Sequence, residues 1–228
     1  MQSVSQSRVR RTSVDLVFDH LYQEINLMKL RPGAKISEAE IAGQFNVSRQ
    51  PVRDAFSRLE NLELVVIRPQ RATEVRRFSA KAIKKSRFIR ASIESEVLRR
   101  AAAECSAQGV KLIDDSLEVQ HSIVANEDFD AFTEQDYVFH KNLCKIAGVE
   151  FAFEVISDEK AKIDRLCVLS HSDGGDRLSE LVSDHDEIGK QIKAGNGEKA
   201  VDAGMLHLSR LDGTIEKILN DHPEYFES

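Results

Sequence analysis

The stretch from Ile36 to Leu64 constrains the fold most, because local signals place two short helices and a tight connection within it. Ser37 followed by Glu40 matches a capping box, which marks a helix start near Glu38. The next positions keep one helical face apolar, with the spacing of Ile41, Ala42 and Phe45. The sequence therefore predicts a short helix that ends before Asn46.

A second helix is predicted to begin at Arg49. Ser48 is a favourable N-cap, and Pro51 is tolerated because a first-turn N–H has no intrahelical acceptor. Four apolar residues fall at i, i+3, i+4 and i+7, namely Val52, Ala55, Phe56 and Leu59. The opposite face therefore points to solvent.

The solvent face of this second helix is suited to DNA. It carries Arg49, Arg53 and Ser57, with Gln50 beside them. Arginine reads guanine edges or grips phosphate, glutamine can pair with adenine, and the N-terminal end of a recognition helix reaches the bases. We predict DNA contacts from Ser48, Arg49, Gln50 and Arg53. The alternative is an ordinary solvated helix face.

A hairpin follows the helix pair. The β-branched run 64–68, the turn 69–72 and the short run 73–76 predict two strands, with Arg71 in the turn as a further candidate DNA contact. Upstream, Ser13 is expected to cap a helix with one apolar side. These elements predict a winged helix-turn-helix domain over residues 13–77, preceded by a flexible arm over residues 1–12.

The net charge of −6 is unevenly distributed along the 228 residues. Residues 1–77 carry 13 Lys and Arg against 9 Asp and Glu, whereas residues 78–228 carry 19 against 29. A basic N-terminal region followed by an acidic region fits a protein that presents only its N-terminal part to a polyanion.

From Phe78 onward the chain lacks strand signals and falls into helical stretches with breaks near Gly109, Asn126, Gly148, residues 172–175 and residues 195–197. These breaks predict six helices. Because short connections favour antiparallel neighbours, residues 78–228 are expected to form an antiparallel six-helix bundle. The fold class is therefore mainly α.

The bundle contains four candidate metal ligands. Asp136 and His140 are four residues apart and share a helical face, while His185 and His207 each lie eleven residues from Asn196, at the centre of a predicted turn. An antiparallel hairpin places those two histidines level. If the turn at Gly148 lies at the same end, all four groups fall about 12–18 Å below it.

Three imidazoles and a carboxylate are a competent ligand set for Zn²⁺, Ni²⁺, Mn²⁺ or a related divalent ion, with positions left for water or an anionic ligand. The alternative is a hydrogen-bonded core without metal. The cysteines form no C-x-x-C pair, and we expect all three to be buried small hydrophobic residues: Cys105, Cys144 and Cys167.

The segment PGAKISEAEIAGQFNVSRQPVRDAFSRLE resembles the N-terminal signature of GntR-family bacterial transcription regulators. The resemblance implies that Arg49, Gln50 and Arg53 occupy the family's DNA-contacting positions. The wing departs from the family pattern at Ala72, where glycine is common.

The later motifs resemble the FadR-type branch and its ligand-binding (FCD) domain. They are Asp136-x-x-Phe139-His140, Asp184-His185 and His207-Leu208. In the metal-containing members an Asp and three His at these positions hold a divalent ion. Residues 90–94 resemble R-x-x-[LIV]-E, which implies that Arg90 faces an effector cavity and binds a carboxylate; the alternative is an Arg90–Glu94 salt bridge.

Together these features predict a transcription regulator rather than an enzyme. We expect a homodimeric repressor that binds a near-palindromic operator and responds to a small carboxylate effector bound with the metal. A metal-dependent hydrolase using the His/Asp cluster is the alternative, and a helix-turn-helix used only for protein contacts is a third option. The sequence shows no signal-peptide pattern and no apolar run that could span a bilayer, so we expect a cytoplasmic protein without membrane contact.

Overall fold

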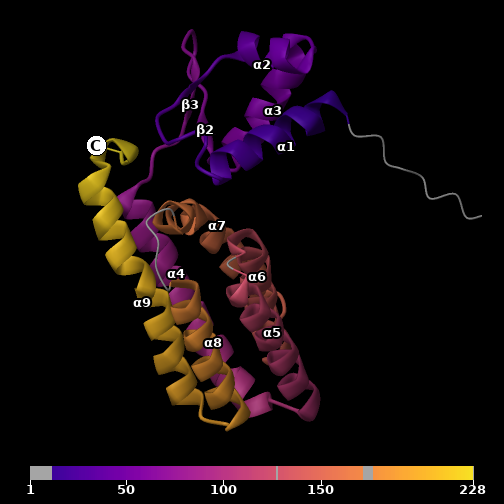
Figure 1. Ribbon diagram of the computed structural model, residues 1–228, viewed down its shortest axis with the longest axis vertical. Coiled ribbons are helices and arrows are strands. Elements are labelled where there is room, and N and C mark those ends of the chain that lie inside the picture. Colours follow the sequence, from indigo (N-terminus) through magenta and orange to yellow (C-terminus); the bar gives the residue numbers. More distant parts are fainter. Residues whose placement is uncertain (1–11, 127, 172–176, 228) are drawn as a thin grey trace, which may run out of the picture. The chain divides into compact units, whose positions relative to one another are not determined.

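The computed structural model describes residues 12–126, 128–171 and 177–227, which form two compact units (Figure 1). The first unit contains the chain up to Phe78 together with residues from His222 onward, and the second spans Ser79–Asp221. The boundary after Phe78 is one residue beyond the predicted boundary. The return of the C-terminal residues to the first unit has no counterpart in the sequence prediction. The arm predicted over residues 1–12 lies outside the described residues, except for Thr12.

The first unit is a winged helix-turn-helix, as predicted. Its helices are α1 (Ser13–Asn26), α2 (Glu38–Phe45) and α3 (Arg49–Asn61). Its strands β1 (Lys35–Ile36), β2 (Val65–Val66) and β3 (Thr73–Val75) form an antiparallel sheet in the order β1-β3-β2. Strand β1 escaped prediction because two residues are too few to show an alternating pattern.

The helix starts follow local capping, with one correction. Thr12 rather than Ser13 is the N-cap of α1, because Thr12 and Asp15 form a complete capping box. Ser37 accepts a hydrogen bond from the Glu40 N–H at 3.3 Å, the forward half of the predicted box. Ser48 has the extended backbone of an N-cap, but its side chain makes no capping hydrogen bond.

The predicted apolar face of α3 forms the core of this unit. Val52, Ala55, Phe56 and Leu59 are all buried, against Val17, Leu21 and Ile25 of α1. Asn46 closes α2 with a left-handed backbone at φ +51°, a conformation that asparagine tolerates better than most residues. The sharp turn between α2 and α3 therefore follows from local chemistry, and the core fixes the solvent face of α3.

The C-terminal residues close the first unit. After the 3₁₀ helix η1 (Pro223–Tyr225), the Phe78 N–H donates to the Tyr225 carbonyl at 2.8 Å, and the Glu227 N–H donates to the Phe78 carbonyl at 2.8 Å. The rings of Phe78 and Phe226 lie 5.6 Å apart. This backbone pairing holds the end of the chain against the last residue before the second unit.

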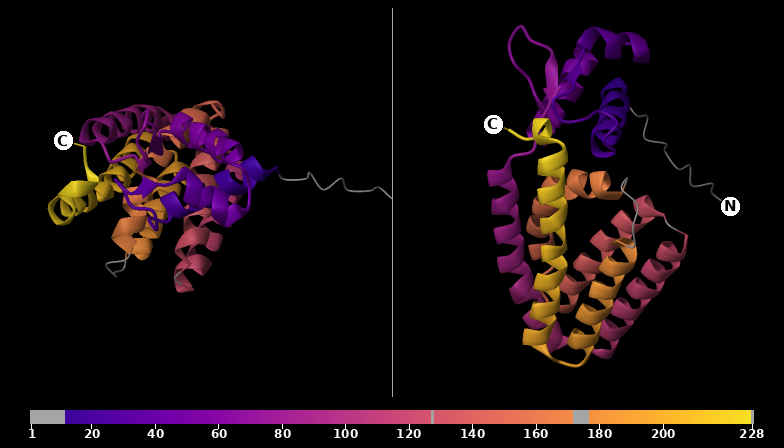
Figure 2. Two further views of the ribbon diagram at one scale, coloured as in Figure 1. Left: turned by 90° about the horizontal axis from the view of Figure 1, so that it is seen from above. Right: turned by 60° about the vertical axis from the view of Figure 1, so that its left-hand side comes forward.

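Within the described residues, the second unit consists of the six predicted helices: α4 (Ala80–Glu104), α5 (Ala107–Ala125), α6 (Phe129–Ile146), α7 (Ala152–His171), α8 (Arg177–Lys193) and α9 (Gly197–Asp221). Helix α4 contacts α6, α7, α8 and α9, and runs alongside α9 for most of its length (Figure 2). Because α4 is covered on several sides, it buries polar as well as apolar residues.

Two sequence expectations for this unit need correction. The chain breaks at Cys105–Ser106 rather than near Gly109, because Ser106 caps α5 and accepts from the Gly109 N–H at 3.3 Å. Among the cysteines only Cys144 is buried, whereas Cys105 and Cys167 are half-buried. The break expected at residues 172–175 lies outside the described residues.

Helices α4 and α9 approach closely where the candidate site lies. A Cβ at Gly204 would overlap the end of the Leu98 side chain, so a larger residue there would require Leu98 to move. One turn further along α9, His207 is buried beside α4.

Candidate functional site

The polar face of α3 is exposed, as its periodicity predicts. Arg53 donates from Nε to Glu38 Oε2 at 2.9 Å, Arg49 Nε lies 3.9 Å from Glu38 Oε1, and both arginine side chains are more than half exposed. Gln50 donates to Asp54 Oδ1 at 2.8 Å. Exposed ion pairs of this kind contribute about 0–1 kcal/mol. These side chains can therefore exchange their partners for phosphate or base edges at little cost.

The remaining candidate DNA contacts are also accessible within this unit. Ser48 is exposed at the N-terminal end of α3, and Arg71 is exposed in the wing turn. The left-handed residue of that turn is Gln70, at φ +58°, so a glycine is not needed at Ala72. The structure thus places all five predicted contacts at the surface of one unit.

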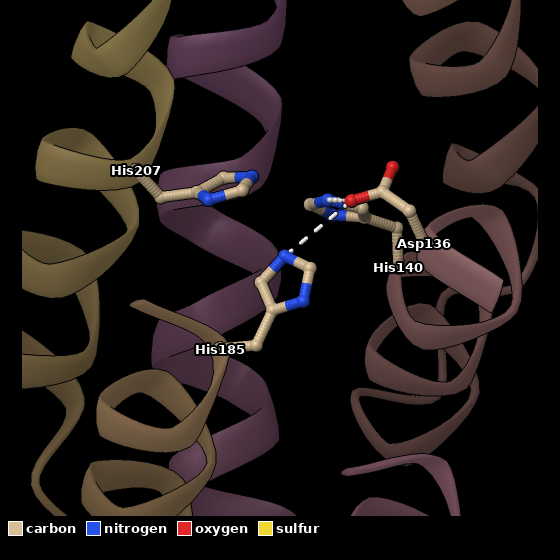
Figure 3. Close-up of side chains that lie close together, drawn as sticks. All are labelled: Asp136, His140, His185 and His207. Atoms are coloured by element: carbon tan, nitrogen blue, oxygen red, sulfur yellow. Dashed lines mark ion pairs between the residues drawn. The ribbon is translucent and has the colours of Figure 1, made fainter. Parts of the chain in front are cut away.

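The second unit brings the four predicted metal ligands together. Asp136 and His140 extend from α6, His185 from α8 and His207 from α9, and their side chains converge (Figure 3). All four are buried, and one ligand atom from each lies within 4.8 Å of the others. The rings of His185 and His207 are 4.6 Å apart. The juxtaposition inferred from the two turns is therefore correct.

Several atoms of the cluster are buried without a hydrogen-bond partner among the described residues. They are His140 Nε2, His185 Nε2 and His207 Nδ1. Leaving a buried polar atom unpaired costs about 1–3 kcal/mol. Nitrogens that face a common point beside a carboxylate are what a divalent ion requires, so the residues present fit such an ion.

Glu94 and Gln120 orient two of the histidines through the ring nitrogens that face away from the cluster. Glu94 Oε2 lies 3.2 Å from His140 Nδ1, and Gln120 Oε1 lies 2.7 Å from His185 Nδ1. With Nδ1–H donated to these oxygens, both rings turn Nε2 toward the centre of the cluster, as outer partners of metal-bound histidines do. Burial lowers the pKa of His185 well below its usual value, which keeps the ring in the neutral form that binds metal.

Asp136 is held by a lysine that is largely shielded from solvent. Lys160 Nζ lies 3.1 Å from Asp136 Oδ2 and 2.8 Å from Asp164 Oδ1, and it sits over the Tyr137 ring. Burial raises the pKa of Asp136, but the adjacent ammonium outweighs burial and holds the pKa below its usual range. Asp136 is therefore a carboxylate whose Oδ1 faces the histidines, 3.4 Å from His185 Nε2.

Arg90 forms the salt bridge that the sequence offered as one alternative, and it also lines a cavity, as the other alternative requires. Its Nε donates to Glu94 Oε1 at 2.7 Å, so the salt bridge exists, while its Nη2 is buried without a partner among the described residues. Burial raises the pKa of Glu94, but the opposite effect of Arg90 and His140 is larger. The pKa is therefore lowered, and the group stays ionised. Glu94 therefore links Arg90 directly to a candidate metal ligand.

A cavity of about 200 Å³ adjoins the cluster. Arg90, Asp136, Lys160 and His207 all line it, so a small ligand inside could reach both the cluster and the arginine. Sequence reasoning missed the contributions of Gln120 and Lys160, which lie on α5 and α7. No spacing rule connects them to the histidines.

Comparison with known proteins agrees with this architecture. Residues 14–75 match the model of the gntR family of bacterial regulatory proteins, and residues 87–210 match the FCD domain. The chain is 31% identical to the HTH-type transcriptional repressor RspR of Escherichia coli K12, over 92% of each chain. It is 27% identical to a probable D-xylose utilization operon transcriptional repressor of Paenarthrobacter nicotinovorans, over 92% of this chain and 91% of the relative.

Among solved structures, Escherichia coli McbR/YncC superposes with a TM-score of 0.70 at 16% identity, covering 91% of this chain and 99% of that chain, which supports the fold. The relatives are transcription regulators and do not support the hydrolase alternative. In the described part of the chain, no helix has the length and apolarity needed to cross a membrane.

Proposed function

This chain belongs to the GntR family of bacterial regulatory proteins and is a DNA-binding transcription regulator with an FCD domain; we propose that it is a repressor controlled by a small carboxylate, which binds together with a divalent metal in the second unit. The observation that carries this proposal is the buried cluster of one Asp and three His beside a cavity lined by Arg90.

Metal binding is supported by the chemistry of the cluster. Asp136, His140, His185 and His207 would hold the ion, and Glu94 and Gln120 would keep two of the imidazoles oriented. Zn²⁺, Ni²⁺ and Mn²⁺ all accept this set of nitrogen and oxygen ligands. The ion would supply an open position for a carboxylate oxygen of the effector.

Effector binding is supported by the contacts of Arg90. A ligand carboxylate would bind Arg90, which is hydrogen-bonded to Glu94. Glu94 in turn contacts His140. Ligand and metal would therefore favour the same arrangement of α4 and α6. A coupling of about 1–3 kcal/mol, typical of allosteric proteins, would change operator affinity about 5- to 150-fold.

On DNA we propose a homodimer, with each α3 reading one half of a near-palindromic operator through Ser48, Arg49, Gln50 and Arg53, and with Arg71 contacting the backbone from the wing. Two of the relatives are named as a repressor or a probable repressor, which favours repression here.

The proposal is tested by selecting an operator from random DNA with the purified, metal-loaded protein and then titrating small carboxylates against the complex. We expect one acid to shift operator affinity at least about fivefold in the wild type. The double variant His140→Ala, His207→Ala should bind the same operator without that shift. An equal response in the double variant would show that the cluster does not sense the effector.

A further inference from the structure

The cavity beside the cluster is small enough to restrict the effector. Its volume of about 200 Å³ lies below the ~300–1,000 Å³ of pockets that enclose drug-sized ligands. Helices α4, α6, α7, α8 and α9 all contribute to its walls. The ligand that fits is therefore a compact molecule, and the charges and apolar groups of the walls decide its class.

Two guanidinium groups on α4 offer unused donors. Arg90 Nη2 and Arg87 Nε are buried and have no hydrogen-bond partner among the described residues, and both arginines line the cavity. The two residues are three apart and therefore share one face of the helix. A carboxylate has two oxygens and can accept a charge-assisted hydrogen bond from each of two arginines.

Once the proposed divalent ion is counted, the charged groups of the cavity wall among the described residues leave one positive charge, which a single ligand carboxylate neutralises. The four positive side chains of the wall pair with five acids, and the two charges of the ion leave one positive charge over: Arg87 pairs with Asp212, Arg90 with Glu94, Lys160 with Asp136 and Asp164, and Arg210 with Asp184. A second ligand carboxylate would also meet Asp136 and Asp164, which line the same cavity. Burying a charge without a partner is strongly unfavourable.

The rest of the wall is apolar. Four helices contribute the side chains of Phe132, Ile163, Val168, Leu181, Met205 and Leu208. Ligand hydroxyl groups placed against these side chains would lose their hydrogen bonds to water without replacement. An aliphatic body, by contrast, would be buried favourably there.

We propose that the effector is a small monocarboxylate with an apolar body, and that Arg87 acts with Arg90 in binding its carboxylate. The proposal deepens the proposed function and rests on it for the link to DNA. It excludes dicarboxylates and polyhydroxylated sugar acids as the preferred ligands of this cavity.

The test measures the binding of three six-carbon acids to the metal-loaded full chain by calorimetry. Hexanoate has one carboxylate and an apolar body, adipate has two carboxylates, and gluconate has one carboxylate and five hydroxyl groups. We expect hexanoate to bind at least about tenfold more tightly than either of the others, because only it leaves no buried charge or hydroxyl unpaired. Equal or tighter binding of adipate or gluconate would overturn the proposal, as would failure of all three to bind.

Matched variants separate the two parts of the proposal. Arg87→Gln should weaken hexanoate binding about tenfold or more through loss of a charge-assisted hydrogen bond, whereas Arg99→Gln, on the exposed part of α4, should not. Met205→Gln should weaken hexanoate and narrow its advantage over gluconate, whereas Leu206→Gln, at an exposed position of α9, should leave both unchanged. Unchanged hexanoate binding in both Arg87→Gln and Met205→Gln would place the ligand elsewhere.

Operator binding is measured separately with the same acids. If hexanoate binds the cavity with the expected preference but leaves operator affinity unchanged, the ligand class stands and the proposed control of DNA binding fails. If the acids bind without preference while one of them changes operator affinity, the proposed function stands and the ligand class is wrong.

Discussion

The two units place charged and polar side chains in opposite physical settings. On α3, Arg49 and Arg53 are exposed and share Glu38 in water, where an ion pair contributes at most about 1 kcal/mol. In the second unit, Asp136 and His185 are buried. Polar groups at the surface are readily redirected to a partner, whereas buried ones are tolerated only with a partner that satisfies them.

This contrast explains how each surface can recognise its ligand. An arginine held weakly by Glu38 loses little when it turns to phosphate. In the buried cluster, one nitrogen on each of three histidines has no hydrogen-bond partner among the described residues, and an ion that binds these nitrogens removes a desolvation cost. The first unit is thus suited to reversible contact with DNA, and the second to retaining a metal.

The largest expected effect is on DNA binding. Arg53→Ala should reduce operator affinity by about 5- to 150-fold, because a bidentate base contact contributes ~1–3 kcal/mol. Fluorescence anisotropy with a labelled operator measures the loss. Arg58→Ala is the control, because Arg58 lies on the same helix but packs over Phe18 and contacts Asp15. Similar losses of operator affinity in both variants would contradict the assignment of the DNA contacts to the exposed face of α3.

Metal removal should affect the second unit alone. Chelation should lower its free energy of unfolding by about 2.7 kcal/mol relative to protein with free metal at 100 times the dissociation constant. Hydrogen exchange resolved by segment separates the units. Amides of α6, α8 and α9 should lose protection, whereas those of α1 and α3 should not. Equal loss in α1 would contradict the contrast between the units.

A smaller effect is expected from the side chains behind the histidines. Gln120→Leu removes the acceptor for His185 Nδ1–H and should weaken metal affinity about 10- to 100-fold, as loss of an outer partner does in other metal sites. Competition with a chromophoric chelator measures it. Gln191→Leu is the matched control, a buried glutamine of α8 that contacts Glu187 instead. Metal affinity that falls equally in the control would mean that the packing of α8, not the hydrogen bond, is responsible.

The smallest predicted effect concerns pH. Burial lowers the pKa of His185, so the unfolded chain binds a proton near pH 6.5 that the folded metal-free chain does not bind. The stability of the metal-free protein should therefore fall as pH drops from about 6.5 to about 5.5, by at most about 1.4 kcal/mol for this group. Urea unfolding at several pH values tests this. His185→Gln should show a shallower slope, and an identical slope would assign it to other groups.

The sequence predicted the exposed surface more completely than the buried site. The α3 face follows from spacing alone, because Val52, Ala55, Phe56 and Leu59 determine which residues face water. The proximity of His185 and His207 could also be inferred, because both lie at the same distance from the turn of one helical hairpin. Here local periodicity and a short connection contain the necessary geometry.

Other features depend on contacts between distant segments. Gln120 and His185 are 65 residues apart, and Lys160 reaches Asp136 from another helix, so no periodic pattern links them. A lysine in the sequence suggests a solvated surface, and only the packed structure shows that Lys160 lies between two carboxylates. The pairing of Phe78 with the C-terminal residues is likewise set by tertiary structure rather than by local signals.

The most direct test of the buried metal site is elemental analysis of the protein purified without chelator, together with Asp136→Ala and Asp186→Ala. Asp186 is an exposed neighbour of the cluster that contacts His121, so its variant controls for removal of a carboxylate nearby. We expect about one divalent ion per chain in the wild type and in Asp186→Ala, and loss of most of it in Asp136→Ala. Wild-type protein without metal that also fails to take up Zn²⁺, Ni²⁺ or Mn²⁺, or full occupancy in Asp136→Ala, would contradict it.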